Sequence, residues 1–173
     1  MDIGIHALDL LRQWLGELKV VEYADDAEGG VEINASARLS SPLCSDVSLR
    51  MSWDWKLPNF YEFKFERGRL RWPTSTATRV LFHANGADRW VDGNVHENGA
   101  SDWNPVGPVS TSHTAAFTQQ WIDVISALKS GAAPPVPPSD AARSLGLVLA
   151  CYKDRKPLGR PWADVPRGGP VNS

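Results

Sequence analysis

FYEFKFERGRLRW, residues 60–72, is the stretch that decides the fold class, because it describes two strands joined by a tight turn. Aromatic residues lie on both sides of its first half, and the turn at Arg67 and Gly68 leads into a second strand at residues 70–72. We expect Gly68 to supply the positive φ angle that a tight hairpin needs. No helical spacing interrupts this stretch, which therefore predicts antiparallel pairing.

Similar short runs surround this hairpin, separated by turn residues and not by helices. They lie at residues 20–23, 31–37, 44–55, 76–84 and 89–91. Asn85 and Gly86 form a strong turn signal between the last two runs. Successive short strands with close turns predict an antiparallel meander.

Helical spacing is found towards the two ends of the chain. Apolar residues recur every three or four positions within residues 5–15, where Gly16 ends the pattern, and within residues 117–128, where Gly131 ends it. A last helix follows the proline-rich residues 132–138. We expect Ser139 to cap this helix. Its packed face is expected to comprise Leu145, Val148, Leu149 and Tyr152.

These patterns together predict the α+β class. The length of 173 residues suits one domain with a hydrophobic core, which we assign to residues 1–165. Residues 166–173 are expected to form a flexible tail. The Gly, Asn, Pro and Ser content of residues 93–112 predicts a long loop, which is typical of functional or mobile segments.

The opening residues 2–16, DIGIHALDLLRQWLG, bring together side chains suited to acid–base chemistry. Asp2 and His6 are four positions apart and can share one face of a first helical turn. A carboxylate beside an imidazole holds and tunes a general base near neutral pH. Asp9 either hydrogen-bonds His6 or is a solvated acid and a partner of Arg12. Asp2 is also typical of a helix N-cap or first-turn acid.

This opening string, followed by Trp14-Leu15-Gly16, resembles a segment of a known family. It is similar to the second domain of the glucose–fructose oxidoreductase, inositol dehydrogenase and MocA (Gfo/Idh/MocA) family of NAD(P)-dependent oxidoreductases. The match is at Asp2, Gly4, His6 and Asp9. The resemblance implies that this segment lines a sugar pocket, with His6 as general base, Asp2 orienting the base or substrate, and Asp9 in contact with substrate. It also implies an open, mostly antiparallel β-sheet with helices on one face, whose other face packs against a second subunit.

The sequence departs from this family on the cofactor side. Family members begin with a Rossmann domain, whereas this sequence has no Gly-x-Gly-x-x-Gly after a strand and no Glu-Lys-Pro segment. We therefore expect no cofactor-binding residues in this chain, and NAD or NADP only through a missing or partner Rossmann domain. The sequence is then either a fragment or a gene that starts inside an ancestral coding sequence.

Composition argues against several other functions. A formal net charge of −2 without a clustered basic face gives no case for nucleic acid, and the apolar runs are too short to cross a membrane. Cys44 and Cys151 lack metal-ligand spacing, and no metal site is expected. As buried thiols they suit a reducing, cytoplasmic location. No Gly-x-Ser-x-Gly elbow supports a hydrolase.

Eight tryptophans are a high count for this length, and their positions bear on partners. We expect Trp14 and Trp121 in the core. Four others lie in or beside strands, where we expect a sheet face buried by a second copy of the chain; they are Trp53, Trp55, Trp72 and Trp90.

Three hypotheses for function follow. The leading one is a free-standing or truncated substrate-binding domain of a sugar or polyol oxidoreductase, which cannot transfer hydride alone. Its expected partners are a small sugar or polyol, a second copy of the chain and a Rossmann-domain protein. The alternative is a non-enzymatic binding or oligomerisation module that kept the fold and lost the chemistry. The third is an enzyme that uses His6 without nicotinamide.

Overall fold

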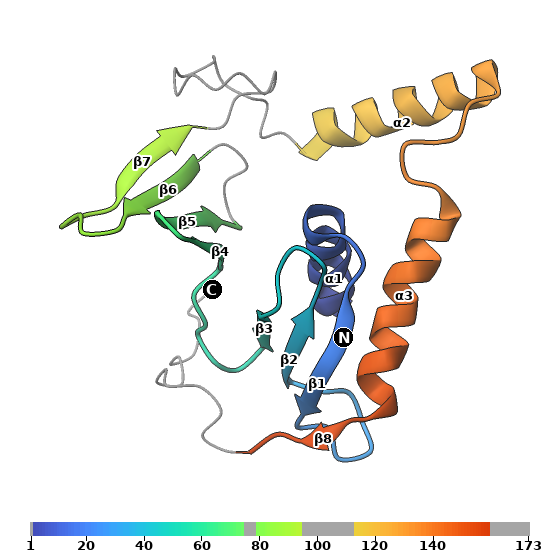
Figure 1. Cartoon of the computed structure of the whole chain (residues 1–173). Coiled ribbons are helices and arrows are strands. Elements are labelled where there is room, and N and C mark those ends of the chain that lie inside the picture. Colours follow the sequence, from blue (N-terminus) through green and yellow to red (C-terminus); the bar gives the residue numbers. More distant parts are fainter. Residues whose placement is uncertain (1, 75–78, 95–112, 160–173) are drawn as a thin grey trace. The chain divides into compact units, whose positions relative to one another are not determined.

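The computed structural model describes residues 2–74, 79–94 and 113–159 (Figure 1). The chain divides into two compact units. Unit 1 combines residues 1–57 with residues 136–173, and unit 2 is residues 58–135. The predicted α+β class is confirmed. Most of the predicted loop at residues 93–112 and the whole predicted tail at residues 166–173 lie outside the described residues, and the single domain at residues 1–165 stays a prediction.

The described residues of unit 1 form two helices and one four-stranded sheet. Its elements are α1 (Asp2–Leu15), β1 (Lys19–Asp25), β2 (Asn34–Ser40), β3 (Val47–Ser52), α3 (Pro138–Lys153) and β8 (Lys156–Pro157). The strand order is β3-β2-β1-β8, with antiparallel pairs except at β8, which runs parallel to the end of β1. Helix α3 packs against both α1 and β1 (Figure 1).

The sheet of unit 1 has one apolar face and one polar face. The register places Tyr23 opposite Ala37 and Ala37 opposite Leu49, so these side chains share a face. Glu22 and Arg38 pair on the other face and are exposed. The buried apolar side chains of the unit come from the first face, from α1 and α3, and from the link between α1 and β1. They are Ala7, Leu8, Leu11, Leu18, Tyr23, Ala35, Ala37, Leu39, Val47, Val148 and Cys151.

Helix α1 ends as the sequence predicts. Gly16 has a φ of 78°, a conformation that side chains disfavour, and its N–H donates to the carbonyl of Arg12 at 2.9 Å. Leu8 is completely buried. The helix differs from expectation at Arg12, which lies on the polar side of the sequence pattern yet is only 8% exposed.

Helix α3 corrects two predictions. It begins at Pro138 with Pro137 as the N-cap, so Ser139 lies inside the first turn and is not the cap. A proline is favoured at the first helical position because its missing N–H would have no partner there. The predicted packed face of α3 is also wrong in part. Ser144, Val148 and Cys151 are buried, whereas Leu145 and Leu149 are exposed.

In unit 2, the ranges that the structure describes form an antiparallel meander and one helix. Its elements are β4 (Phe60–Phe65), β5 (Gly68–Pro73), β6 (Arg79–Ala84), β7 (Val91–Asn94) and α2 (His113–Ser130). The strands pair in chain order, as predicted. The register aligns Phe63, Leu70, Phe82 and Val91 in one row across all four strands. This row, with Tyr61, Phe65 and Trp72 on the same side, is called the aromatic face below.

The glycines at the two hairpin turns have different roles. Gly86 has a φ of 80° and confirms the predicted turn. Gly68, however, is not among the glycines with positive φ, so the predicted reason for it is wrong. A Cβ added at Gly68 would lie 2.5 Å from the carbonyl oxygen of His83 and 3.1 Å from the ring of Phe82. Gly68 is needed because the neighbouring strand passes too close for a side chain.

Helix α2 has apolar side chains that remain largely exposed. Trp121 is 66% exposed, so its predicted place in the core is wrong. Ala127 is the buried apolar residue of this helix among those described. None of the helices in the described ranges is sufficiently long and apolar to span a bilayer.

Candidate functional site

The predicted site residues all lie on α1. Asp2 and His6 are separated by just over one helical turn, which places their Cα atoms on one side of the helix. The side chain of His6 is exposed. The side chain of Asp2 lies outside the described part of the structure, so the predicted contact between Asp2 and His6 stays a prediction.

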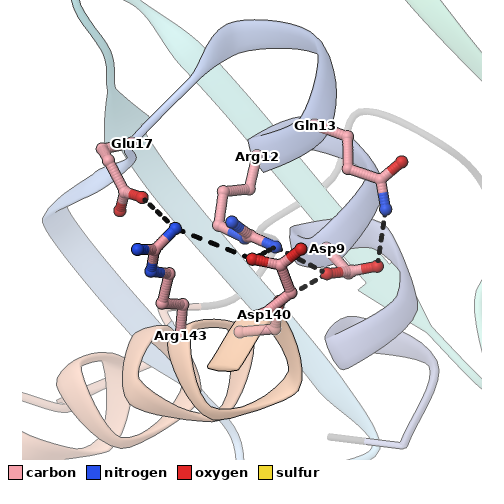
Figure 2. A network of polar contacts seen from close by, with 7 residues as sticks. Asp9, Arg12, Gln13, Glu17, Asp140 and Arg143 are labelled. Atoms are coloured by element: carbon pink, nitrogen blue, oxygen red, sulfur yellow. Dashed lines mark hydrogen bonds and ion pairs between the residues drawn. The ribbon is translucent and has the colours of Figure 1, made fainter. Parts of the chain in front are cut away.

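Asp9 is directed towards α3 (Figure 2). Its carboxylate accepts hydrogen bonds from Ser144 Oγ at 2.6 Å and from Arg12 Nη2 at 3.4 Å through Oδ1. Its Oδ2 accepts from Gln13 Nε2 at 3.1 Å. The sequence left Asp9 either as a hydrogen-bond partner of His6 or as a solvated acid that pairs with Arg12, and the contact observed is the one with Arg12. Its proposed contact with substrate stays a prediction.

Figure 2 shows that the contact of Asp9 belongs to a chain of alternating charges between α1 and α3. The guanidinium of Arg12 lies 3.4 Å from Asp9 and 3.5 Å from Asp140. Arg143 in turn lies 3.6 Å from Asp140 and 3.7 Å from Glu17. We call these five residues the α1–α3 charge network. It joins the helix that carries His6 to a helix more than a hundred residues later in the sequence.

The hydrogen-bond partners of Asp9 change its acidity. The hydroxyl of Ser144, and after it the guanidinium of Arg12, lower the pKa of Asp9 below its usual 3.8, against an opposing effect of burial. Asp9 is therefore ionised at neutral pH, where it acts as a hydrogen-bond acceptor. Sequence reasoning could find Arg12, which is one turn from Asp9, but no local spacing indicated Ser144 or Asp140.

The imidazole of His6 is accessible on α1. An exposed imidazole can accept or donate a proton at a bound hydroxyl, whereas the Asp9 carboxylate is occupied by three donors. His83 packs against Trp90, with ring centroids 5.2 Å apart, and belongs to the meander of unit 2. His96 lies outside the described residues. Within the described ranges, no group of His, Cys, Asp and Glu could hold a metal ion.

Two solved oxidoreductases share this fold. The 3-ketoreductase KijD10 from Actinomadura kijaniata, solved with NADP and TDP-benzene, matches 90% of this chain with a TM-score of 0.62 and 20% identity. Levoglucosan dehydrogenase, in complex with NADH and levoglucosan, matches 89% of this chain with a TM-score of 0.65 and 14% identity. No protein-family model and no curated protein sequence matches.

The matches cover this chain and part of each neighbour. This chain accounts for 45% of KijD10 and 48% of levoglucosan dehydrogenase, so it spans about half the length of each. At these identities the likeness shows a shared fold.

The dinucleotides in those two complexes raise the question of whether this chain could hold one. A Rossmann cradle requires a strand, a glycine-rich loop and a helix, followed by a parallel strand. In the part of the chain that the structure describes, the parallel pair is the short contact of β1 with β8, and no glycine-rich loop connects a strand to a helix. The described residues therefore do not form a Rossmann cradle.

Proposed function

We propose that this chain is the substrate-binding domain of a sugar or polyol oxidoreductase, either free-standing or truncated, of the Gfo/Idh/MocA type. The observation that carries the proposal is the fold shared with about half of a 3-ketoreductase and of levoglucosan dehydrogenase. The exposed position of His6 on α1 supports it, because a general base must reach its substrate. The motif at Asp2, Gly4, His6 and Asp9 gives further support.

In this proposal the residues of α1 have separate roles. His6 accepts the proton of a substrate hydroxyl, and Asp2 orients the imidazole or the substrate. The Asp9 carboxylate, through Ser144 and Arg12, fixes α1 against α3, and any contact it makes with substrate is additional. The chain by itself transfers no hydride, and NAD or NADP would be bound by a Rossmann domain elsewhere or in a partner. The free thiols of Cys44 and Cys151 are consistent with a cytoplasmic location.

Ligand-induced stabilisation tests this proposal. We expect levoglucosan, glucose or myo-inositol to raise the unfolding temperature, since a ligand at 100 times its Kd stabilises a protein by about 2.7 kcal/mol. His6→Ala should abolish the shift, whereas Gln13→Ala, an exposed change on the same helix, should preserve it. NADH and NADPH should give no shift.

Two results would contradict the proposal. A sugar-induced shift that persists in His6→Ala would place the pocket elsewhere. Tight binding of NADH or NADPH would show that the chain has its own cofactor site. If no sugar or polyol shifts the unfolding temperature, the alternative of a binding or oligomerisation module without chemistry is favoured.

The aromatic face supports a proposed homo-oligomer, which is common to both candidates. Phe65 and Val91 on this face are 61% and 57% exposed, and large exposed apolar patches are typical of protein interfaces. We expect a dimer in sedimentation velocity, and expect Phe65→Lys to shift it towards monomer. Lys64→Ala, on the opposite face of the same strand, should leave the dimer intact. A monomeric wild-type chain at high concentration would rule out this interface.

A further inference from the structure

Strand β1 has an open edge. It pairs with β2 from Lys19 to Asp25, with a bulge at Val21, but pairs with β8 only at Ala24 and Asp25. No other described strand pairs with residues 19–23 on the side away from β2. An unpaired edge presents backbone N–H and C=O groups that can pair with an added strand.

A hollow of about 420 Å³ lies beside this edge, within unit 1. Residues 19–23 line it on one side, and Leu147, Ala150, Cys151 and Asp154 of the α3 region line it on the other. Successive side chains of a strand point to opposite faces of the sheet. Five consecutive strand residues can therefore line one hollow only where it opens along the edge of the strand. We call this hollow the β1–α3 groove.

The walls of the β1–α3 groove are partly apolar. Val21 is 52% exposed, and Leu18, Leu147 and Ala150 add further apolar surface. Burial raises the pKa of Cys151 to about 11, so this thiol is protonated near neutral pH. The groove thus offers a surface for binding without a thiolate nucleophile.

The rim of the groove carries an excess of positive charge. Its three lysines are Lys19, Lys153 and Lys156, against the acids Glu22 and Asp154. Lys156 is already paired, because its Nζ lies 3.1 Å from Glu22 and lowers the pKa of that carboxyl. Among the described residues, Lys19 and Lys153 have no ion-pair partner.

We propose that the β1–α3 groove binds an extended acidic segment of a partner protein, which adds a strand beside residues 19–23. Alternate side chains of the added strand would face the apolar wall, and its carboxylates would meet Lys19 and Lys153. A small anion could pair with the lysines. It could not hydrogen-bond to the successive backbone groups of β1, which repeat at the spacing of a strand. A second copy of this chain would bring its own lysines to the same edge, where like charges repel.

A labelled peptide tests the proposal directly. The probe is a fluorescein-labelled eight-residue peptide in which glutamate and valine alternate, and the readout is fluorescence anisotropy at low salt. We expect saturable binding to the wild-type chain. The double variant Lys19→Glu, Lys153→Glu should bind at least about tenfold more weakly, which corresponds to about 1.4 kcal/mol. Lys129→Glu makes the same substitution at a single lysine on α2, with half the change of charge, and should bind as the wild type does.

Two further measurements separate strand addition from charge attraction alone. The same peptide with N-methylated alternate residues cannot donate backbone hydrogen bonds on one side, and we expect its binding to be lost. Binding of the unmodified peptide should slow hydrogen exchange at amides within residues 19–23. Equal binding of the methylated peptide, no saturable binding of the acidic peptide, or displacement by equimolar inorganic phosphate would each overturn the proposal.

Discussion

Arg12→Met is expected to destabilise unit 1 by about 2–3 kcal/mol at neutral pH, somewhat less than the loss of one partner from a completely buried ion pair. The guanidinium of Arg12 is held between Asp9 and Asp140, and Arg12 is only 8% exposed. Methionine keeps most of the packing of the side chain and removes its charge. Urea unfolding, followed through hydrogen exchange of the α1 amides, measures the loss.

A matched variant separates burial from charge. Arg143→Ala also removes an ion pair to Asp140, but the side chain of Arg143 is 58% exposed. We expect it to change stability by no more than about 0.5 kcal/mol, as exposed ion pairs usually do. Equal losses for Arg12→Met and Arg143→Ala would show that burial of Arg12 does not set the stability of the α1–α3 charge network.

The same network predicts the direction of a pH dependence. Because Ser144 and Arg12 lower the pKa of Asp9 in the folded state, these contacts stabilise the fold above the usual pKa of 3.8. The stabilisation is lost as the pH falls through the lowered folded-state pKa. The difference between the wild type and Arg12→Met should therefore shrink as the pH falls below 3.8. A constant difference from pH 2 to pH 7 would contradict the proposed pairing with Asp9.

Gly68→Ala is expected to destabilise the meander of unit 2 by about 1–3 kcal/mol, the usual range for forcing an extra methyl into close packing. The new Cβ would meet the backbone of β6 at His83, which cannot move aside as a flexible side chain could. Hydrogen exchange of the β5 and β6 amides measures the effect locally.

Two other substitutions test the reason given for Gly68. Gly146→Ala, within α3, adds a methyl group with nothing within 4 Å and should stabilise by about 0.5–1 kcal/mol, because alanine is the better helix former. Gly68→Asn should destabilise the meander more than Gly68→Ala does. Asparagine is better tolerated than alanine only where the backbone has a positive φ, and Gly68 has none. If Gly68→Asn were the milder change, backbone conformation would be the constraint at this position and not the approach of β6.

The sequence predicts those parts of the fold that depend on near neighbours. Helix ends at Gly16 and Gly131 and the turn at Gly86 follow from the need for a positive φ, and all three glycines have one. The antiparallel order of the meander follows from short strands with close turns. These features could be predicted because the residues that determine them lie within a few positions of each other.

Features set by distant residues could not be predicted in this way. The burial of Arg12 depends on Asp140, and the direction of Asp9 depends on Ser144, which is 135 positions away. The packed side of α3 differs from its apolar pattern because buried Ser144 has an acceptor there, while Leu145 remains exposed. For the candidate site, the motif correctly predicted a helix carrying His6, and the partners of Asp9 on α3 became known only from the structure.

Unit 1 is assembled from both ends of the described chain, and this has a consequence for biosynthesis. Tyr152 bonds to Glu32 and Lys156 bonds to Glu22, so α3 and β8 close contacts across 120 to 134 positions. Translation delivers α1 and the first three strands long before α3 is made. The contacts that α3 and β8 make with this early part can therefore form only after α3 has been synthesised. Until α3 leaves the ribosome, the apolar side of that sheet lacks the helix that packs against β1.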